Sequence, residues 1–425
     1  MQPKGIVAIA IVAVLIITGS CAVLLTNDNP DNDPFTGDVD AAGKPIEPVD
    51  NLDNGIVAIG QDSFRWITYF DLADRCVMID WNDSYNFLGK SYMYVGRALV
   101  DIEGSDTATP DDMTYYSHTN CGITDDDFRT ILELNPSVVV VPKGFYTDYK
   151  NIMNALDKQG INTVAIDYVY TFLEPGTFQI TEQVENQIDI LAKALCQEER
   201  GQELKDAFED CVSDIRTFTD RISVERTAYV GSLAYNGAHG IDSSMTYYMP
   251  LELAGVRNIV GGTPDWTDSG VRTFSAPEIK KNLQDDTILF IDASGYHVNT
   301  DNTSKGILEM FKGHDAYTIA PYIWTGINHD TVFVNALQIL RFAYGDEVIT
   351  ESEYEEAVKN VYERFYGTYE SNRNIDNPNK ISGTLDLPSE GTTILEDMNA
   401  VYEAVRGVSI GAEVTIGDGG TLSTA

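Results

Sequence analysis

The residues of this sequence that could do chemistry form no catalytic motif. There is no G-x-S-x-G elbow for a nucleophilic serine and no G-x-x-x-x-G-K-[ST] loop for ATP phosphates. Ser, His and Asp occur together near His239 and Asp242, but no spacing singles out a catalytic triad. With 66 acidic residues, accidental carboxylate pairs are certain, so no glycosidase pair stands out. We therefore predict a protein that is not an enzyme and needs no cofactor.

The histidines are the main candidates for ligands of a bare metal ion, and their spacing indicates no site. They are His118, His239, His297, His314 and His329. Metal sites in proteins typically pair their ligands at short, regular spacings, and neither paired histidines nor a C-x-x-C pair occurs here. Direct binding of a bare metal ion is therefore an alternative function, but no sequence motif supports it.

The charge balance is strongly acidic. Asp and Glu number 66 against 28 Lys and Arg, which gives a net charge of −38. Such a surface repels nucleic acids and anionic lipid headgroups, so we exclude both as partners. Basic residues are scarce in this chain. Arg65, Arg97 and Lys143 are therefore noteworthy as groups that could hold an anionic ligand. Ion pairs with nearby carboxylates are the alternative role for each.

Aromatic, amide and basic side chains gather directly after short apolar runs. In open α/β sheets ligands bind outside the carboxyl ends of the strands, so these segments predict a binding site. Large aromatic residues also fill protein cores, which is the alternative for each of them, although Tyr322 and Trp324 look least like core residues beside Pro321 and Gly326. The predicted ligand-binding residues are Arg65, Trp66, Trp81, Lys143, Tyr146, Tyr235, Asn236, His239, Trp266, Tyr322, Trp324 and Asn328.

Short β-branched runs that alternate with helical patterns predict an α/β fold of two lobes, each with a parallel sheet as its core. Residues 55–176 form the predicted N-terminal lobe and residues 224–350 the predicted C-terminal lobe. Thr124, with Asp127 three residues later, predicts a helix start between two of the strands. The predicted strands are Ile56–Ile59, Val77–Ile79, Val138–Val141, Thr163–Ile166, Thr227–Val230, Thr287–Ile291 and Ala316–Ile319.

Helices are expected to connect the two lobes over residues 177–223. The apolar residues there recur at helical spacing, with a break near Gly201. A helix from Gly201 to Ser223 would reach about 33 Å and would allow only a small closure of the lobes. Residues 351–425 are expected to hold a C-terminal helix, Glu351–Tyr366, and a polar tail with a further helix within Glu390–Arg406.

The N-terminus predicts that the body of the protein lies outside the cytoplasm. Gly5–Leu25 carries no charge and is long enough to cross a hydrocarbon core of about 30 Å, so residues 1–25 are predicted to be a membrane anchor or signal segment. Residues 26–54 are predicted to be an acidic, disordered tether. The segment around Cys21 loosely resembles a lipoprotein cleavage site. A retained anchor, lipidation at Cys21 and simple cleavage are therefore three open alternatives. In each of them the rest of the protein lies outside the cytoplasm.

Four cysteines follow the tether. An even number of cysteines in an exported chain permits two disulfides, in three possible connectivities. Cys196 and Cys211 are close in sequence, which favours pairing them, and Cys76 would then pair with Cys121.

Several segments resemble the extracytoplasmic substrate-binding proteins of ABC importers for ferric siderophores and cobalamin, especially their archaeal members. The resemblance covers Gly55–Gly367. In the loop before Asn328 the sequence departs from the archaeal pattern at Ile323 and Thr325, which bears on the identity of the ligand. The segments that carry the resemblance are Tyr69–Asp80, Leu132–Val141, Tyr229–Ile241 and Leu251–Asn258.

The resemblance implies a two-lobed protein that captures an iron complex outside the cell and delivers it to an ABC permease. The complex would be a siderophore, haem or a cobalamin-like metal chelate. An acidic residue on each lobe would dock with the permease, with Glu252 as the candidate on the second lobe. Related proteins of this fold bind bare metal ions, which is one alternative. A structural or adhesive surface protein is another. The sequons at Asn82 and Asn302 fit this alternative and the substrate-binding hypothesis equally.

Overall fold

The computed structural model describes residues 38–85, 87–95, 115–118, 122–235, 237–262, 270–324, 326–367 and 393–424. The described residues all belong to one compact unit, Gly37–Ala425. Within the described residues, no helix is both long and apolar enough to cross a membrane. The predicted anchor over residues 1–25, including Cys21, lies outside the described residues, as do Arg97, Cys121, Asn236, Trp266 and Thr325.

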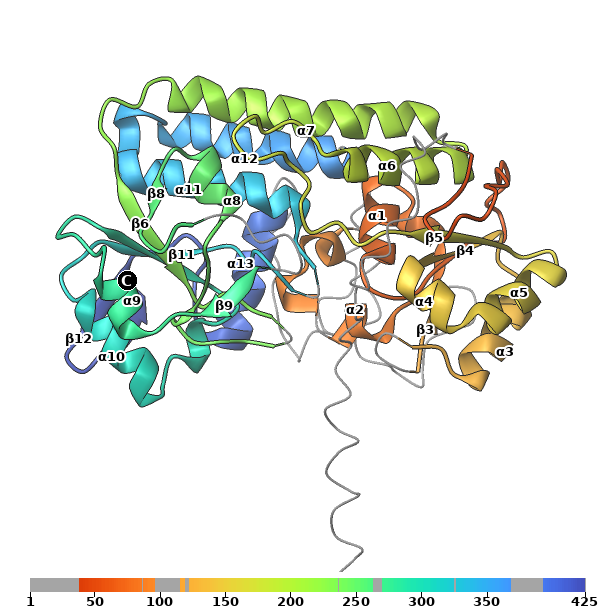
Figure 1. Ribbon diagram of the computed structural model, residues 1–425, viewed down its shortest axis with the longest axis horizontal. Helices are drawn as coiled ribbons and strands as arrows, with labels where there is room; N and C mark the ends of the chain where they lie inside the picture. Colours follow the sequence, from red (N-terminus) through yellow and green to blue (C-terminus); the bar gives the residue numbers. More distant parts are fainter. Residues whose placement is uncertain are drawn as a thin grey trace, which may run out of the picture. The chain divides into compact units, whose positions relative to one another are not determined.

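A parallel five-stranded sheet forms the core of the first lobe, in the order β3-β2-β1-β4-β5. Figure 1 labels β3, β4 and β5 of this sheet. Every residue of β1 and β4 is buried, because helices cover both faces of this sheet. The strands are β1 (Ile56–Ala58), β2 (Cys76–Ile79), β3 (Tyr115–Tyr116), β4 (Val138–Pro142) and β5 (Asn162–Ile166). The helices of this lobe are α1 (Ser63–Tyr69), η1 (Ala73–Arg75), α2 (Trp81–Tyr85), η2 (Phe87–Gly89), η3 (Ser91–Tyr94), α3 (Asp125–Leu134), α4 (Lys143–Asp148) and α5 (Lys150–Lys158).

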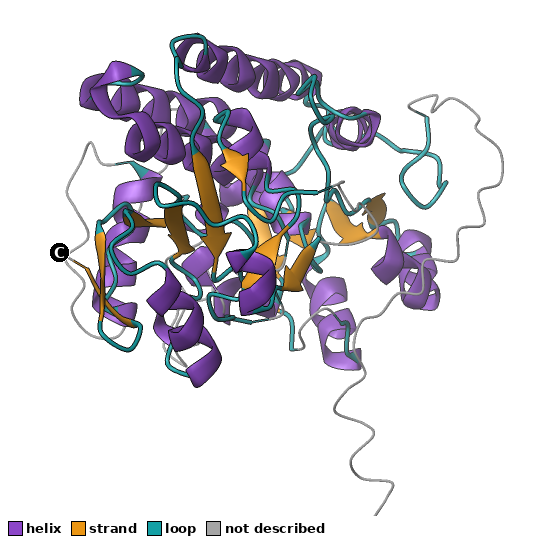
Figure 2. Ribbon diagram, turned by 60° about the vertical axis from the view of Figure 1, so that its left-hand side comes forward, coloured by secondary structure: helices purple, strands orange, loops and turns teal. Residues whose placement is uncertain are grey.

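A second parallel sheet forms the core of the second lobe, in the order β11-β10-β6-β8. In Figure 2 the strands run through the interior, with helices around them. The two parallel-sheet cores predicted from the sequence are therefore confirmed. The elements of this lobe are β6 (Thr227–Gly231), β7 (Ser243–Met245), α8 (Met249–Leu253), β8 (Arg257–Asn258), β9 (Val271–Thr273), α9 (Ala276–Lys280), β10 (Ile288–Asp292), η5 (Tyr296–Val298), α10 (Asn302–Met310) and β11 (Ala316–Ile319).

Long helices form a layer beside both sheets (Figure 1). They are α6 (Glu182–Ala194), α7 (Glu198–Thr219), α11 (His329–Tyr344) and α12 (Glu351–Tyr366), and the short η6 (Gly345–Glu347) lies between the last two. The predicted long helix is present as α7, whose 22 residues reach about 33 Å. The predicted break near Gly201 is wrong, because the chain turns at residues 195–197 and Gly201 lies inside α7. A Cβ at Gly201 would lie 2.7 Å from the Cβ of Ala192, so this glycine lets α6 and α7 pack closely.

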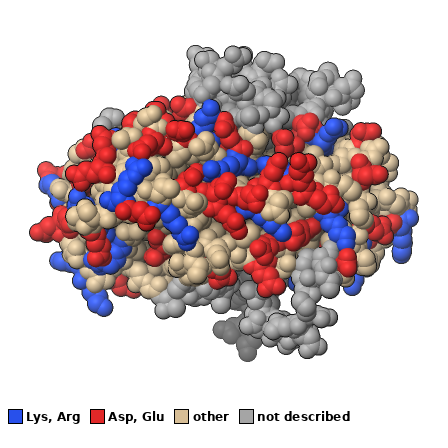
Figure 3. Space-filling view, turned by 90° about the horizontal axis from the view of Figure 1, so that it is seen from above, with Lys and Arg blue, Asp and Glu red and all other residues tan. Residues whose placement is uncertain are grey.

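The outer face of this helical layer is charged. Figure 3 shows Asp and Glu side chains spread across it, with Lys and Arg side chains between them. Lys205 on α7 pairs with Asp189 on α6 at 2.7 Å, for example, and the Asp189 side chain is 48% exposed. Exposed pairs of this kind each contribute about 0 to 1 kcal/mol, so the layer is stabilised mainly by its buried side.

Residues 393–424 belong to the second lobe. They form α13 (Ile394–Arg406), β12 (Val414–Gly417) and β13 (Thr421–Thr424). The Thr318 backbone N–H donates to the Ala412 carbonyl at 2.9 Å, which attaches this segment to the free edge of β11. Val414 and Ile416 join the core of the lobe, and α13 contacts η2 and η3 of the first lobe. A helix within Glu390–Arg406 was predicted, but its contacts with both lobes were not.

The predicted Cys196–Cys211 disulfide is wrong. Cys196 lies in the turn before α7, and Cys211 lies well inside that helix, with both thiols unbridged. Their separation along the helix is about 20 Å, whereas a disulfide needs Cα atoms within about 7 Å. Proximity in sequence was a poor guide here because the intervening residues are helical. Cys76 is buried in β2, and its predicted partner Cys121 lies outside the described residues.

We expect iodoacetamide to modify Cys196 in the folded protein and Cys211 only after unfolding, without any reductant. Alkylation requires a thiolate, and burial raises the pKa of the Cys211 thiol to about 12, whereas Cys196 is only half-buried. Mass spectrometry of peptides from native and urea-unfolded samples measures this difference. If both cysteines resist alkylation in urea until a reductant is added, they are disulfide-bonded and the described arrangement of α7 is wrong.

Candidate functional site

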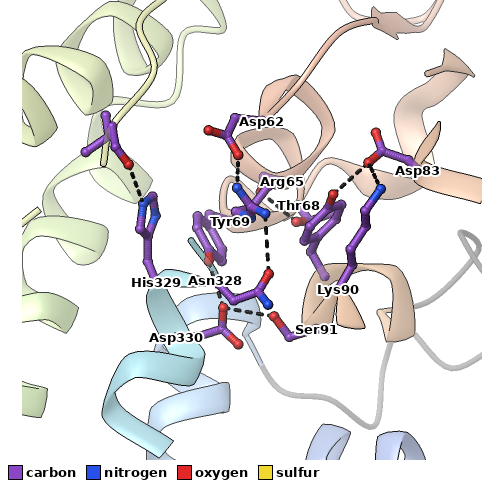
Figure 4. Close-up of polar contacts among 12 residues, drawn as sticks. Asp62, Arg65, Thr68, Tyr69, Asp83, Lys90, Ser91, Asn328, His329 and Asp330 are labelled. Carbon is purple, nitrogen blue, oxygen red and sulfur yellow. Dashed lines mark hydrogen bonds and ion pairs between the residues drawn. The ribbon is translucent and has the colours of Figure 1, made fainter. Parts of the chain in front are cut away.

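Polar side chains from the first lobe and from the start of α11 meet in a buried cluster, which we call the interlobe junction (Figure 4). The first-lobe residues follow β1 and β2, and the others follow β11, so all of them come after the carboxyl ends of parallel strands. That is where ligands bind in open α/β sheets. The junction comprises Asp62, Arg65, Tyr69, Ser91, Asn328 and Asp330.

Arg65 is the cation of the junction, and its side chain is completely buried. It forms an ion pair with Asp62, and its Nη2 donates to Asn328 Oδ1 at 3.3 Å. Its guanidinium lies 4.8 Å from the centre of the Tyr92 ring. Asp62 adopts a left-handed backbone conformation with φ of 71°, which Asp tolerates better than most residues, at the residue before α1. This local geometry places a carboxylate beside a buried cation.

Asn328 connects the two sides of the junction. Its Nδ2 donates to the Gly89 carbonyl of the first lobe at 2.7 Å. Two glycines allow the close approach, since a Cβ at Gly326 would lie 2.6 Å from Asp62 Oδ1 and one at Gly89 would lie 2.9 Å from Trp324 Cε3. The structure therefore brings together three of the residues that the sequence predicted separately: Arg65, Trp324 and Asn328.

Asp330 is the second polar centre of the junction and is fully buried. Its Oδ1 accepts hydrogen bonds from the Tyr69 hydroxyl at 2.8 Å and from Ser91 Oγ at 3.0 Å. Ser91 Oγ also lies 3.1 Å from the Tyr366 hydroxyl, which extends the network to α12. Burial raises the pKa of Asp330, and the hydrogen bonds from Ser91 and Tyr69 oppose that rise.

A neighbouring buried network ties the loops after β1 and β2 together. Lys90 Nζ donates to Asp83 Oδ1 at 3.0 Å and to the Asn82 carbonyl at 2.7 Å, and burial lowers the pKa of Lys90 while Asp83 opposes the shift. Asp80 Oδ2 accepts from the Gly60 backbone N–H at 3.0 Å. Burial, with a smaller contribution from Asp83, raises the pKa of Asp80 to about 6. These contacts give the first-lobe side of the junction a fixed, hydrogen-bonded framework.

Three predicted ligand-binding residues lie in the protein core instead. Trp66 is fully buried and packs against Tyr69 and His329, with ring centroids 5.6 and 5.3 Å away. Tyr146 belongs to the core of the first lobe. Tyr322, which looked least like a core residue, is only 2% exposed and packs on Tyr248 with centroids 4.7 Å apart. Their rings are covered by distant parts of the chain, which local sequence does not reveal.

Other predicted residues lie at the surface or at its edge. Lys143 is exposed at the start of α4, and Trp81 is half-buried at the start of α2. Tyr235 and His239 are exposed in the loop after β6, where His239 Nε2 lies 2.6 Å from the Tyr235 carbonyl oxygen. This contact fits a role for His239 in holding its own loop. Glu252, the proposed permease contact, is exposed on α8.

The sequence analysis missed Asp62, Tyr69, Ser91 and Asp330. Asp62 directly follows β1 and lies three residues before Arg65, so the argument that selected Arg65 would also have found it. Tyr69, Ser91 and Asp330 lie inside or beside helices and carry no local signal of that kind. Among the described residues, no three His, Cys, Asp or Glu side chains are grouped as metal ligands.

We expect Asp292 to make the protein less stable as pH rises from about 4 to about 7. Its carboxylate, at the end of β10, accepts from the Ser294 and Tyr322 backbone N–H groups, but burial dominates and raises its pKa to about 7. The folded state then holds a proton that the unfolded state releases near pH 4, so this contribution to stability is lost as pH rises through 7. The loss between pH 5 and pH 8 is about 2 to 3 kcal/mol.

Urea unfolding at pH 5 and pH 8 measures this effect in the wild type and in Asp292→Asn. The variant should lose less stability than the wild type between the two pH values. Asp285→Asn, which removes an exposed carboxylate shortly before the same strand, is the matched control and should lose as much as the wild type. Equal losses in all three proteins would show that Asp292 is ionised in the folded protein at both pH values.

Comparisons with known proteins agree with this architecture. A family model described as periplasmic binding protein matches residues 118–321. No curated protein matches the chain.

Three solved structures illustrate the similarity. The molybdate periplasmic binding protein MolA of Haemophilus influenzae is 16% identical, with 78% of this chain and 97% of MolA covered and a TM-score of 0.51. A periplasmic solute binding protein from Veillonella parvula is 16% identical, with 80% and 95% covered and a TM-score of 0.49. The periplasmic heme-binding protein RhuT from Roseiflexus sp. RS-1 is 16% identical, with 69% and 98% covered and a TM-score of 0.40. The similarity to MolA shows that this chain has the fold of a periplasmic solute-binding protein.

Proposed function

We propose that this protein captures a small-molecule ligand outside the cytoplasm, between its two lobes, and delivers it to an ABC permease. The interlobe junction is the observation that carries the proposal. It places Arg65, from beyond β1, against Asn328, from beyond β11, where the carboxyl ends of two parallel sheets supply the loops. The match to periplasmic binding proteins over residues 118–321 and the fold shared with MolA support the same function.

The proposed ligand is an iron complex, namely a siderophore, haem or a cobalamin-like metal chelate. The sequence resemblance supports this choice, and the half-buried Trp324 beside Gly89 offers an aromatic surface for a large organic ligand. An anionic chelate would have to replace Asp62 as the partner of the buried Arg65 guanidinium. MolA binds molybdate, and a small oxyanion is the competing ligand class because it would use the same cation.

Two further parts of the proposal concern partners. Residues 1–25 would hold the protein at the membrane, with lipidation at Cys21 as one way to do so.

Glu252, exposed on α8, would contact a basic pocket of the permease. Exchange of Glu252 for Gln should therefore reduce uptake by an intact importer while leaving ligand binding unchanged.

A thermal-shift screen of the full chain tests the proposed function. The compounds are ferric siderophores, haem, cobinamide, cobalamin and molybdate. A ligand that binds only the folded state at 100 times its Kd stabilises that state by roughly 2.7 kcal/mol, which raises the melting temperature visibly. A higher melting temperature with an iron complex supports the proposal. A higher melting temperature with molybdate alone would mean that the ligand is a small oxyanion instead of an iron complex. If no compound shifts the melting temperature, ligand capture loses its support and the structural or adhesive alternative is favoured.

A further inference from the structure

A pocket lies in the second lobe, toward the carboxyl end of α11, and we call it the α11 pocket. Its volume is about 620 Å³, within the range of small-molecule sites. Gln338, one of its lining residues, is about 15 Å along α11 from Asn328, so the pocket is separate from the interlobe junction. The residues that carry the argument are Tyr317, Gln338, Arg341, Phe342, Asp346 and Glu351.

Two stacked aromatic rings line the pocket. The rings of Tyr317 on β11 and Phe342 on α11 are nearly parallel, with centroids 4.3 Å apart and an angle of 6° between their planes. Both residues are only half-buried. The pair therefore gives the pocket an aromatic, apolar part among polar groups.

Gln338 supplies an unused hydrogen-bond donor. Its side chain is fully buried. Its Oε1 accepts a hydrogen bond from the Ala320 backbone N–H at 3.1 Å, which fixes the orientation of the amide. The nitrogen Nε2 lies beside the Tyr354 phenol but completes no hydrogen bond with a described residue. A buried donor without an acceptor is costly, so a ligand oxygen placed here would relieve that cost.

The mouth of the pocket carries two carboxylates around one guanidinium. Arg341 Nη1 contacts Asp346 Oδ1 at 2.5 Å, and Arg341 Nε contacts Glu351 Oε2 at 2.8 Å. The two acidic side chains are 75% and 61% exposed, so their remaining lone pairs are open to a ligand. Because the mouth has a net negative charge, it disfavours an anionic ligand.

These groups together select the chemistry of the ligand. An anion would face two carboxylates, and a simple cation would leave the Gln338 donor without an acceptor. A hydroxyl group donates and accepts at the same time, so a ligand rich in hydroxyls satisfies Gln338, Asp346 and Glu351. The C–H face of a sugar ring also suits the stacked Tyr317 and Phe342.

We infer that the α11 pocket binds a neutral saccharide. The sugar ring packs on the aromatic pair, one hydroxyl accepts from Gln338 Nε2, and others donate to Asp346 and Glu351. This site is independent of ligand capture between the lobes. Ile410 and Gly411 complete its lining, and they come from the C-terminal segment, which lies beyond the residues that match the periplasmic binding protein family.

Saturation-transfer NMR on the full chain tests this inference. The neutral probes are glucose, galactose, mannose and N-acetylglucosamine, and the charged probes are choline and benzoate. We expect at least one neutral sugar to receive saturation from the wild type. The double variant Asp346→Asn, Glu351→Gln should bind that sugar about tenfold more weakly, because the amide oxygens still accept hydrogen bonds but lack the charge that strengthens the bonds to carboxylates. Both substitutions keep the side-chain shape and lie at exposed positions, so the variant should fold. Circular dichroism checks that it is folded.

The matched control is the double variant Asp285→Asn, Asp286→Asn, which removes two exposed carboxylates from the same lobe outside the pocket. It should bind the sugar as the wild type does. The inference is overturned if no neutral sugar receives saturation, or if the two double variants bind the sugar equally. It is also overturned if choline or benzoate binds in place of the sugars.

Discussion

Replacement of Asp62 by asparagine is expected to lower the free energy of unfolding by about 3 to 5 kcal/mol. The variant leaves the buried guanidinium of Arg65 without its carboxylate, and an uncompensated buried charge is strongly destabilising. Asparagine has nearly the same shape as aspartate, and it also tolerates the positive φ of 71° at this position. The loss therefore reports the charge rather than backbone strain. Urea unfolding monitored by circular dichroism measures it.

Asp126→Asn is the matched control for this prediction. Asp126 pairs with Arg129 at the same three-residue spacing within the same lobe, but both side chains are more than 60% exposed, at 63% and 66%. An exposed pair of this kind contributes about 0 to 1 kcal/mol, so its removal should have little effect. Similar losses for Asp62→Asn and Asp126→Asn would mean that Arg65 is not held in a buried ion pair and that the interlobe junction is more open than described.

Tyr322→Ala is expected to lower the free energy of unfolding by about 3 to 5 kcal/mol, the range for truncation of a large buried aromatic residue. Tyr322 is 2% exposed and packs on the fully buried Tyr248. Its backbone N–H also donates to Asp292 at 2.8 Å, a contact that the substitution keeps. The loss therefore measures the packing of the ring. Urea unfolding and the melting temperature both report it.

Trp324→Ala, two residues later in the same loop, provides the comparison. Trp324 is half-buried beside Gly89 of the first lobe, so its removal should cost about 1 kcal/mol. In the proposed function its ring contacts the ligand, and the variant should bind the ligand from the thermal-shift screen more weakly. If Trp324→Ala is the more destabilising of the two, Trp324 is the core residue and Tyr322 becomes the better candidate for ligand contact.

Local patterns were sufficient to predict the two sheets and several helices. A run such as Val138–Val141 is buried on both faces whatever follows it, because a parallel strand covered by helices requires apolar residues throughout. Thr124 and Asp127 form the predicted capping box at the start of α3, since both partners of that contact lie within one helical turn. The spacing of apolar residues also predicted α7, although it placed the start of this helix too late. In each case, residues a few positions apart supply the stabilising contacts.

The role of an individual side chain depended on its contacts with residues that are distant in sequence. Trp66, Tyr322 and Trp324 share the same local setting after a strand, yet the first two are core residues and the third borders the junction. The reason is physical, because the environment of a side chain is set by whichever segments pack over it. Arg65 and Asn328 are 263 residues apart in sequence, and only the folded arrangement of β1 and β11 joins them. Tertiary packing therefore decided which of the predicted residues form one site.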